Sequence, residues 1–188
     1  MRKIVLGMSM SLDGYFEGPD HDISWHQVDD ELHQFLNDDL RTRSAFLHGR
    51  VTYDLMADVW PTADADPDAD GPTAEFAGIW RDMPKYVYSR TLRHARWNTT
   101  VVRDVVPAEV EALKDGPGGD LSIGGADLAA AFAAHDLIDA YDIYVHPVLV
   151  GRGRRLFADR DALTRLRLVH TRQFGNGVVL LRYGRATS

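Results

Sequence analysis

Two adjacent glycines stand where the phosphate of a ligand could meet the backbone. Residues 122–132 read SIGGADLAAAF, so Gly124 and Gly125 end a short apolar run and precede an alanine-rich helical stretch. Glycine has no Cβ, which lets an anion approach the main chain closely. A helix that begins near Ala126 would offer that anion unpaired N–H groups and the positive end of its dipole. The alternative is a tight turn that was selected for helix packing. Taken by itself, the motif favours this alternative.

Two further segments have the same organisation. In FLHGRVTYDLM, Gly49 follows an apolar run, Arg50 is able to reach a phosphate, and Thr52 offers a hydroxyl at a helix start. In YVYSRTL, Ser89 and Arg90 leave the end of a strand, where an arginine could hold the 2′-phosphate of NADP. Taken alone, the first segment is equally well explained as an ordinary helix N-cap with a surface arginine. The second, taken alone, is better explained as a solvated arginine. Because ligands of open α/β sheets bind beyond the carboxyl ends of the strands, the three segments together predict a nucleotide site.

The elements that must position these residues alternate between strand-like and helix-like patterns. Apolar runs and 3.6-residue periodicity predict strands at 3–9, 44–49, 85–89, 99–105, 120–123 and 140–150, and helices at 29–41, 51–60, 73–83, 107–115 and 128–137. Residues 165–184 are expected to form two strands joined through Asn176-Gly177, a strong hairpin signal. The segment at about 61–72 is acidic and rich in proline and glycine, which predicts a mobile, solvated loop.

This alternation predicts an α/β fold with a central, mostly parallel sheet of about eight strands, helices on both faces and an antiparallel C-terminal edge. A length of 188 residues fits a single domain over 1–188 with a sizeable core.

The net charge of −7 argues against binding to nucleic acid or to an anionic membrane. No cysteine is present and the histidines show no metal-binding spacing, so we expect no metal. No apolar run reaches membrane-spanning length, and we expect a cytoplasmic protein.

The order of these motifs resembles the dihydrofolate reductase superfamily. The similarity is greatest to the reductase domain of bacterial bifunctional riboflavin-biosynthesis deaminase-reductases and to its small stand-alone relatives. MSLDGYFEGPDHDISW is similar to the N-terminal strand and substrate-side loop of that family, and VHPVLVGRGRRLF to the long strand and following loop of the stand-alone relatives. LHGRVTYDLM, VYSRTL and SIGGADLAAAF resemble the three cofactor segments, in the same order. The resemblance implies a dihydrofolate reductase-like three-layer sandwich over nearly the whole chain.

The resemblance also implies that the cofactor is NADPH. The residues that would bind it are Gly49, Arg50, Val51 and Thr52 for the phosphates, Ser89, Arg90 and Thr91 for the 2′-phosphate, and Gly124, Gly125 and Ala126 for the pyrophosphate, with Asp127 and Leu128 beside them. The cofactor carries the hydride, so the protein has to position the reactants and manage a proton.

An acidic residue early in the first helix is the main candidate for the substrate side. In dihydrofolate reductases this acid follows a tryptophan-containing loop, and here Trp25 precedes DDELHQF. Glu31 falls at the expected position, with Phe35 one turn further on, and Asp30 is the alternative acid. Such a carboxylate would orient a heterocycle and assist its protonation. The competing interpretation is that these acids only stabilise the helix N-terminus.

Two more residues are candidates for the substrate side. Asp13 lies in the SLDG loop, which borders the substrate in the riboflavin-pathway reductases; its alternative role is that of a turn-forming residue before Gly14. Tyr53, in the first turn of the helix after Gly49, would line the pocket. The sequence thus provides two catalytic candidates, Glu31 and Asp13.

These expectations define an NADPH-dependent reductase that delivers hydride to a C=N or C=O carbon of a small heterocyclic or ribosyl-linked substrate. The resemblance indicates the 5-amino-6-(5-phosphoribosylamino)uracil reductase type. The alternatives are a dihydrofolate or pterin reductase, a non-catalytic NADP-binding dimeric protein, and a plain α/β domain whose glycine turns are coincidental. The chain has neither the length nor the cysteines of an additional zinc deaminase domain, which leaves the pathway open. The resemblance and the apolar late strands YDIYVHPVLV and VVLLRY favour a homodimer, because edge strands of that kind are often covered by a partner.

Overall fold

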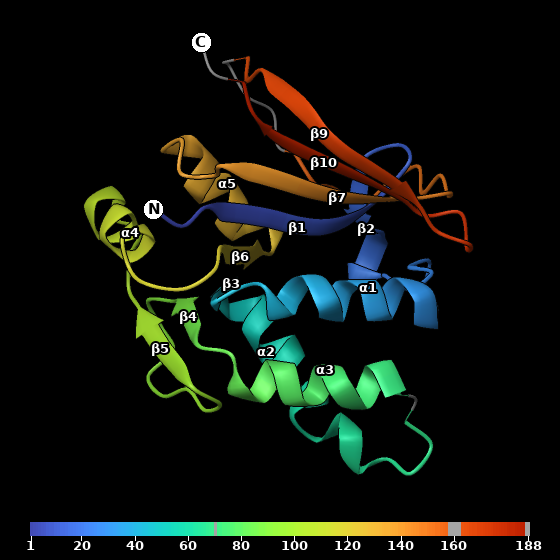
Figure 1. Cartoon of the computed structure of the whole chain (residues 1–188), viewed down its shortest axis with the longest axis horizontal. Helices are drawn as coiled ribbons and strands as arrows, with labels where there is room; N and C mark the ends of the chain where they lie inside the picture. The colour runs from blue at the N-terminus through green and yellow to red at the C-terminus, as the bar shows by residue number, and fades with distance from the viewer. Residues whose placement is uncertain (70, 158–162, 187–188) are drawn as a thin grey trace.

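A single mixed sheet organises the computed structural model, which describes residues 1–69, 71–157 and 163–186 (Figure 1). Its strand order is β5-β4-β3-β6-β1-β7-β10-β9. The strands are β1 (Ile4–Ser11), β3 (Ala45–Gly49), β4 (Lys85–Tyr88), β5 (Thr99–Val102), β6 (Leu121–Gly124), β7 (Ala140–His146), β9 (Leu166–Gln173) and β10 (Val179–Arg185). The run from β5 to β7 is parallel, whereas β10 is antiparallel to both of its neighbours. The predicted mostly parallel sheet with an antiparallel C-terminal edge is therefore confirmed.

Helices cover both faces of this sheet and complete a three-layer sandwich. One face carries α1 (Asp30–Arg41), α2 (Arg50–Val59) and α3 (Gly71–Asp82), and the other carries α4 (Pro107–Lys114) and α5 (Ala126–Ala134). Figure 1 shows α1 and α3 side by side below the sheet. Because side chains alternate along a strand, Phe46 of β3 packs with the α2 and α3 residues and Leu47 with those of α4 and α5.

The C-terminal hairpin has the predicted turn. The β9 and β10 strands pair around Asn176-Gly177, and Gly177 has a φ of +87°, which a side chain would disfavour. The turn is closed by the N–H of Gly177, which donates to the carbonyl of Phe174 at 3.0 Å. None of the helices in the described ranges is long and apolar enough to cross a bilayer.

The structure corrects three of the expected segments. The expected loop at about 61–72 begins as a 3-10 helix, η2 (Trp60–Ala65), because Pro61 is buried and Arg81 donates to the Pro61 carbonyl and the Asp64 carboxylate, each at 2.8 Å. The helix α3 then starts at Gly71, before the predicted residue 73, and Asp70 lies outside the described residues. The expected strand over 140–150 ends at His146, because Pro147 has no N–H to donate to a neighbour.

The segment after β1 also contains regular structure that the sequence did not predict. Strand β2 (Tyr15–Glu17) pairs with β8 (Arg154–Arg155) in a small separate sheet, and a 3-10 turn, η1 (Pro19–His21), follows β2. This second sheet brings the loop after β7 against the loop after β1. Both loops leave the carboxyl ends of neighbouring parallel strands, so they border the same edge of the main sheet.

Candidate functional site

The three predicted junctions lie side by side at one edge of the sheet. Strands β4, β3 and β6 are consecutive neighbours and run parallel, so their carboxyl ends point the same way. In the register of these strands Gly49 is opposite Tyr88, and His48 is opposite Gly124. The segments that begin at Gly49, Ser89 and Gly124 therefore leave the sheet next to one another. This is the arrangement that a ligand at the carboxyl edge of an α/β sheet requires.

The first turns of α2 and α5 meet at Gly125, where a side chain would come too close to Thr52. Gly125, the N-cap of α5, has a φ of +93°, and a Cβ built on it would lie 2.5 Å from Thr52 Oγ1. A Cβ on Gly49, the N-cap of α2, would lie 3.8 Å from the Cβ of Leu128. Neither helix receives a side-chain cap, so their first N–H groups stay available beyond the glycines. Bare backbone beside two helix N-termini fits the phosphates of a nucleotide.

The two arginines predicted for phosphate are held in surface ion pairs. Arg50 donates to Asp54 at 3.0 Å, and the Arg90 Nε donates to Asp104 at 2.7 Å. The side chains of Arg50 and Arg90 are 50% and 82% exposed. Exposed pairs of this kind stabilise a protein by less than about 1 kcal/mol. Either arginine could therefore exchange its carboxylate for a phosphate at little cost.

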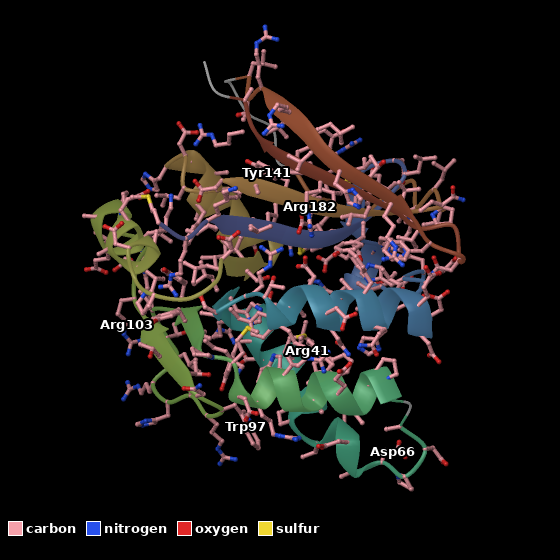
Figure 2. The ribbon with its side chains drawn as sticks, viewed as in Figure 1. Arg41, Asp66, Trp97, Arg103, Tyr141 and Arg182 are labelled. Atoms are coloured by element: carbon pink, nitrogen blue, oxygen red, sulfur yellow. The ribbon has the colours of Figure 1, made fainter. Side chains whose placement is uncertain are left out.

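The segment after β4 is held in a fixed turn. The Ser89 hydroxyl accepts from the N–H groups of Thr91 and Leu92 at 3.3 and 3.0 Å. Arg103, labelled in Figure 2 just beyond β5, donates to the carbonyls of Ser89 and Leu92 at 3.0 and 2.7 Å. The Ser89 side chain is thus committed to the turn that presents Arg90.

The remaining predicted cofactor residues lie around the start of α5 and α2. Asp127, in the first turn of α5, accepts from Arg154 at 2.5 Å, and Arg154 also donates to Glu17 of β2 at 3.1 Å. Leu128 is buried, whereas Val51 on α2 is 57% exposed. These contacts connect the small β2-β8 sheet to the glycine-bearing edge.

A cavity of about 200 Å³ lies between α1 and the sheet, next to this edge. Gly7 of β1 is part of its lining, and a Cβ on Gly7 would have no atom within 4 Å. The polar side chains of the lining are those of Ser9, Asp39, Arg43, His48, Ser122, Asp142 and Tyr144. His48 and Gly124 also lead directly into the two glycine junctions. The cavity and the glycine-bearing edge are therefore contiguous.

Two aspartates and two arginines form a buried network at the cavity wall. Arg43 bridges Asp39 and Asp142, at 2.7 and 3.0 Å from its Nη2. Arg182 of β10, labelled in Figure 2, bridges the same aspartates, at 2.7 Å to Asp39 Oδ1 and 2.7 Å to Asp142 Oδ1. The Asp142 and Arg43 side chains are only 3% and 8% exposed. Burial, with these two aspartates nearby, also raises the pKa of the Tyr144 hydroxyl well above its usual range, so Tyr144 keeps its proton.

Two buried histidines near the cavity are neutral at pH 7. Burial and the positive charge of Lys85 lower the pKa of His48 to about 4, and its Nδ1 is buried without a hydrogen-bond partner. Burial and the neighbouring His26 lower the pKa of His146 to about 4 as well. The adjacent Lys85 is itself buried against Trp80, which lowers its pKa to about 8. Both imidazoles therefore act as neutral hydrogen-bonding groups.

We predict that these histidines make folding stability fall with acid between pH 6.5 and 4. An unfolded histidine binds its proton near pH 6.5, whereas the folded sites bind it only near pH 4. The unfolded state thus takes up more protons in this window, and stability falls as the pH falls. At pH 5 each histidine should cost about 2 kcal/mol relative to pH 7.5. Urea unfolding at both pH values measures this loss.

A pair of variants separates this effect from general acid destabilisation. In His48→Gln the difference between pH 7.5 and 5.0 should shrink by about 2 kcal/mol. His94→Gln, at an exposed histidine, should leave that difference unchanged. An equal pH dependence in wild type and His48→Gln would show that His48 is protonated in the folded protein at pH 5.

The structure places the predicted acid of α1 away from the cavity lining. Glu31 accepts from the N–H of Gly175 at 2.9 Å and from Arg172 at 3.0 Å. These two contacts lower the pKa of Glu31, so it is a carboxylate anchored to the C-terminal hairpin. The acid of α1 that lines the cavity is Asp39, two turns later. Asp30, the alternative, is also absent from the described lining.

The other predicted substrate residues also face other neighbours. The ring of Phe35 packs edge-on against Phe174, 5.2 Å between centroids. Tyr53 is buried, and its hydroxyl donates to the Arg96 carbonyl and accepts the Arg96 N–H. Trp25 packs against His146, with ring centroids 5.6 Å apart. Trp25 thus borders His146, which contacts Ser9 of the cavity wall, and Tyr53 belongs to the same hydrophobic cluster as the lining residues Phe46 and Phe76.

Asp13 has a positional role at the edge of the sheet. It accepts from the Ser11 hydroxyl at 2.7 Å and from the N–H groups of Val150 and Gly151 at 3.1 and 2.7 Å. The Ser11 hydrogen bond, followed by these backbone bonds, lowers the pKa of Asp13. The carboxylate thus ties the loop after β1 to the loop after β7. Its catalytic role stays a prediction.

Several cavity residues were missed at the level of sequence. For Asp142 and Tyr144 the signal is the alternation in AYDIYVH. It places both residues, together with His146, on one face of an internal strand. Polar residues on that face need a partner or a ligand. Asp39 and Arg43 carry no such signal, because charges at the end of a helix usually face solvent.

Among the described side chains, no cluster of three or more histidines and acids could hold a metal.

The fold and this site together define a dihydrofolate reductase-like protein, with a glycine-bearing carboxyl edge and an adjoining cavity beneath the first helix. More specifically, the chain belongs to the RibD C-terminal domain family, whose model matches residues 2–180. It is 33% identical over 183 residues to the Bacillus subtilis protein YyaP, a match that covers 97% of this chain and 94% of YyaP. The resemblance inferred from the motifs is thereby confirmed.

Solved structures of two other proteins share the fold. A Shewanella sp. PV-4 protein named for riboflavin biosynthesis superposes with a TM-score of 0.74 at 20% identity and covers all of both chains. The Thermotoga maritima diaminohydroxyphosphoribosylaminopyrimidine deaminase/5-amino-6-(5-phosphoribosylamino)uracil reductase superposes with a TM-score of 0.65 at 15% identity, over 98% of this chain and 57% of that one. The chain thus spans little more than half of the bifunctional protein.

Proposed function

We propose that this protein is an NADPH-dependent reductase of a small heterocyclic or ribosyl-linked substrate. The observation that carries the proposal is the contact between the N-terminal turns of α2 and α5, where a Cβ on Gly125 would strike Thr52. Bare backbone at that point fits a pyrophosphate, and the cavity begins at the adjoining His48 and Gly124. The reductase named in the Thermotoga maritima protein acts on an aminouracil, which supports the substrate class.

In this proposal the chain binds and orients its reactants. NADPH, when bound, supplies the hydride for a C=N or C=O carbon. The glycine edge would hold its pyrophosphate, and Arg90, presented by the fixed turn after β4, would hold its 2′-phosphate. The cavity would take the substrate ring, with Asp39 and Asp142 as hydrogen-bond acceptors and Ser9 and Tyr144 as hydroxyl donors.

Parallel titrations with NADPH and NADH test this proposal. Quenching of the four tryptophans should report tight binding of NADPH and weaker binding of NADH. Arg90→Ala should reduce the preference for NADPH by about 10-fold or more, because hydrogen bonds to charged groups contribute about 1.5–3 kcal/mol. Arg93→Ala, at an exposed arginine of the same segment, is the matched control and should keep the preference. Binding of neither nucleotide would refute the proposal.

We further propose that the protein is a homodimer joined through the β9 edge. The β9 strand ends the sheet and exposes Leu166, Leu168 and Val169. The apolar strands β7 and β10, which favoured a dimer at the level of sequence, lie inside the sheet, so the edge strand with which a second copy would pair is β9. Sedimentation equilibrium should give twice the mass of the chain, and Leu168→Lys should shift the species toward monomer. A monomer mass for the wild-type protein would refute this assembly.

A further inference from the structure

We propose that the Ser9 hydroxyl is a dedicated hydrogen-bond donor to a carbonyl oxygen of the substrate and that His146 is the residue that positions it. The inference rests on the proposed function, since it assigns a specificity contact within the same cavity. It is carried by the hydrogen bonds of His146, by the place of Ser9 in the cavity lining, and by the packing around the imidazole.

The hydrogen bonds of His146 define which of its nitrogens carries the proton. His146 is fully buried, and its Nδ1 lies 3.1 Å from the backbone nitrogen of Gln27. A backbone N–H only donates, so Nδ1 must accept, and a neutral imidazole then carries its hydrogen on Nε2. The Nε2 atom lies 3.1 Å from Ser9 Oγ. His146 therefore donates to Ser9.

This donation determines what Ser9 can offer to a ligand. A hydroxyl that accepts one hydrogen bond still has its own hydrogen, and that hydrogen must point away from His146. Within the described part of the chain no acceptor for the Ser9 hydroxyl is found, and Ser9 is part of the cavity lining. The hydrogen is thus available to a molecule in the cavity, which must provide an acceptor.

The surroundings of His146 keep it in this form. The ring of His26 stacks on it, 5.2 Å between centroids, and Trp25 meets it edge-on. A second proton on Nδ1 would face the Gln27 N–H, donor against donor, without water to solvate it. The groups that meet this imidazole are Ser9, Trp25, His26 and Gln27, and none of them is an acid. His146 therefore orients Ser9 and supplies no proton itself.

The rest of the lining complements such a donor. Asp39 Oδ1 and Asp142 Oδ1 each accept one hydrogen bond, from Arg182, and each has a second lone pair that suits an N–H group of a ligand. Ser9 lies opposite Tyr144 in the register of β1 and β7, so a second hydroxyl comes from the neighbouring strand. Acceptors at one side and hydroxyl donors at the other match a ring that carries both N–H groups and carbonyl oxygens.

A pair of probes tests the role of Ser9: the first carries ring carbonyls, and in the second amino groups replace them and the ring N–H groups become acceptor nitrogens. The probes are 5,6-diaminouracil and 2,4,5,6-tetraaminopyrimidine, in which amino groups replace both carbonyls. By calorimetry at pH 7.5, wild type should bind the uracil more tightly. Ser9→Ala should lower the affinity for the uracil by about 3- to 10-fold, the usual value of one neutral hydrogen bond, and leave the affinity for the tetraamine unchanged. Thr100→Ala removes an exposed hydroxyl from β5 and should change neither affinity.

The role of His146 has its own readouts. Long-range ¹⁵N spectra of the wild-type protein at pH 7.5 should show His146 as the Nε2–H tautomer. His146→Leu should lower the affinity for the uracil as Ser9→Ala does, and His146→Gln, whose amide N–H can replace Nε2–H, should restore part of it. The spectra need no variant, so the assignment can be checked even if His146→Leu does not fold.

Three results would overturn the inference. They are an Nδ1–H tautomer of His146, an equal loss of affinity for both probes in Ser9→Ala, and binding of neither probe by the wild-type protein. In the last case the NADPH titration still decides the proposed function, because the phosphate edge is separate from Ser9. Failure of the substrate contact and failure of the cofactor site are thereby distinguished.

Discussion

Replacing Gly125 by alanine is expected to lower NADPH affinity by more than 10-fold and to destabilise the fold by about 1–3 kcal/mol. At this position φ is +93° and ψ is 125°, a backbone region that is almost restricted to glycine. The new Cβ would also lie 2.5 Å from Thr52 Oγ1. The start of α5 must then move away from α2. The backbone between the two helix N-termini, which is the proposed pyrophosphate site, then changes shape. Fluorescence titration and urea unfolding measure the two effects.

Two further variants show where the loss comes from. Gly78→Ala is the matched control, because a Cβ there would lie 4.0 Å from Arg81 Nη2, an ordinary van der Waals contact, and alanine inside a helix is favoured over glycine by up to about 1 kcal/mol. Combining Gly125→Ala with Thr52→Ala removes the contact with Oγ1 but keeps the strained φ. If steric overlap dominates, the double variant is more stable than Gly125→Ala alone. Wild-type affinity for NADPH in Gly125→Ala would contradict the proposed pyrophosphate site.

The glycine-bearing edge that we propose for the cofactor could be located from the sequence because its signals are local. Gly49 and Gly124 each follow an apolar run and precede a helical pattern, and both strands are confirmed. Parallel strands joined through helices place such junctions at the same edge, so the topology follows from the alternation alone. What the sequence did not reveal is the contact between Gly125 and Thr52, which depends on β3 and β6 being neighbours.

The substrate side was harder to predict because its residues come together only through tertiary packing. Glu31 has the right spacing from Trp25, but the C-terminal hairpin folds back over the start of α1 and occupies its carboxylate. The hairpin itself was predicted, whereas its docking site depends on Phe174 packing with Leu32. Arg182 is separated from Asp39 by most of the chain, and no local pattern connects them.

Loss of the Asp142 carboxylate is expected to destabilise the protein by about 3–5 kcal/mol, because it removes one of the two carboxylates that the Arg43 and Arg182 guanidinium groups share. In Asp142→Ala, Arg43 would keep only its contacts with Asp39 and, at 3.9 Å, Asp120, although its side chain is 8% exposed. Arg182 would keep only Asp39. The cost is large because buried charges lose their solvation, whereas the intact network offsets that loss with directed hydrogen bonds. Urea unfolding of Asp142→Ala and wild type at pH 7.5 measures it.

An exposed ion pair of the same composition is the control for this prediction. Asp136→Ala breaks the pair between Asp136 and Arg185, which are 69% and 39% exposed, and should cost less than about 1 kcal/mol. Asp142→Asn keeps one acceptor oxygen and the shape of the side chain, so its loss should lie between the two. If Asp142→Ala costs no more than Asp136→Ala, water reaches Arg43 and Arg182. The polar wall of the cavity would then be a solvated surface, and the donor and acceptor pattern proposed for the substrate would lose one of its sides.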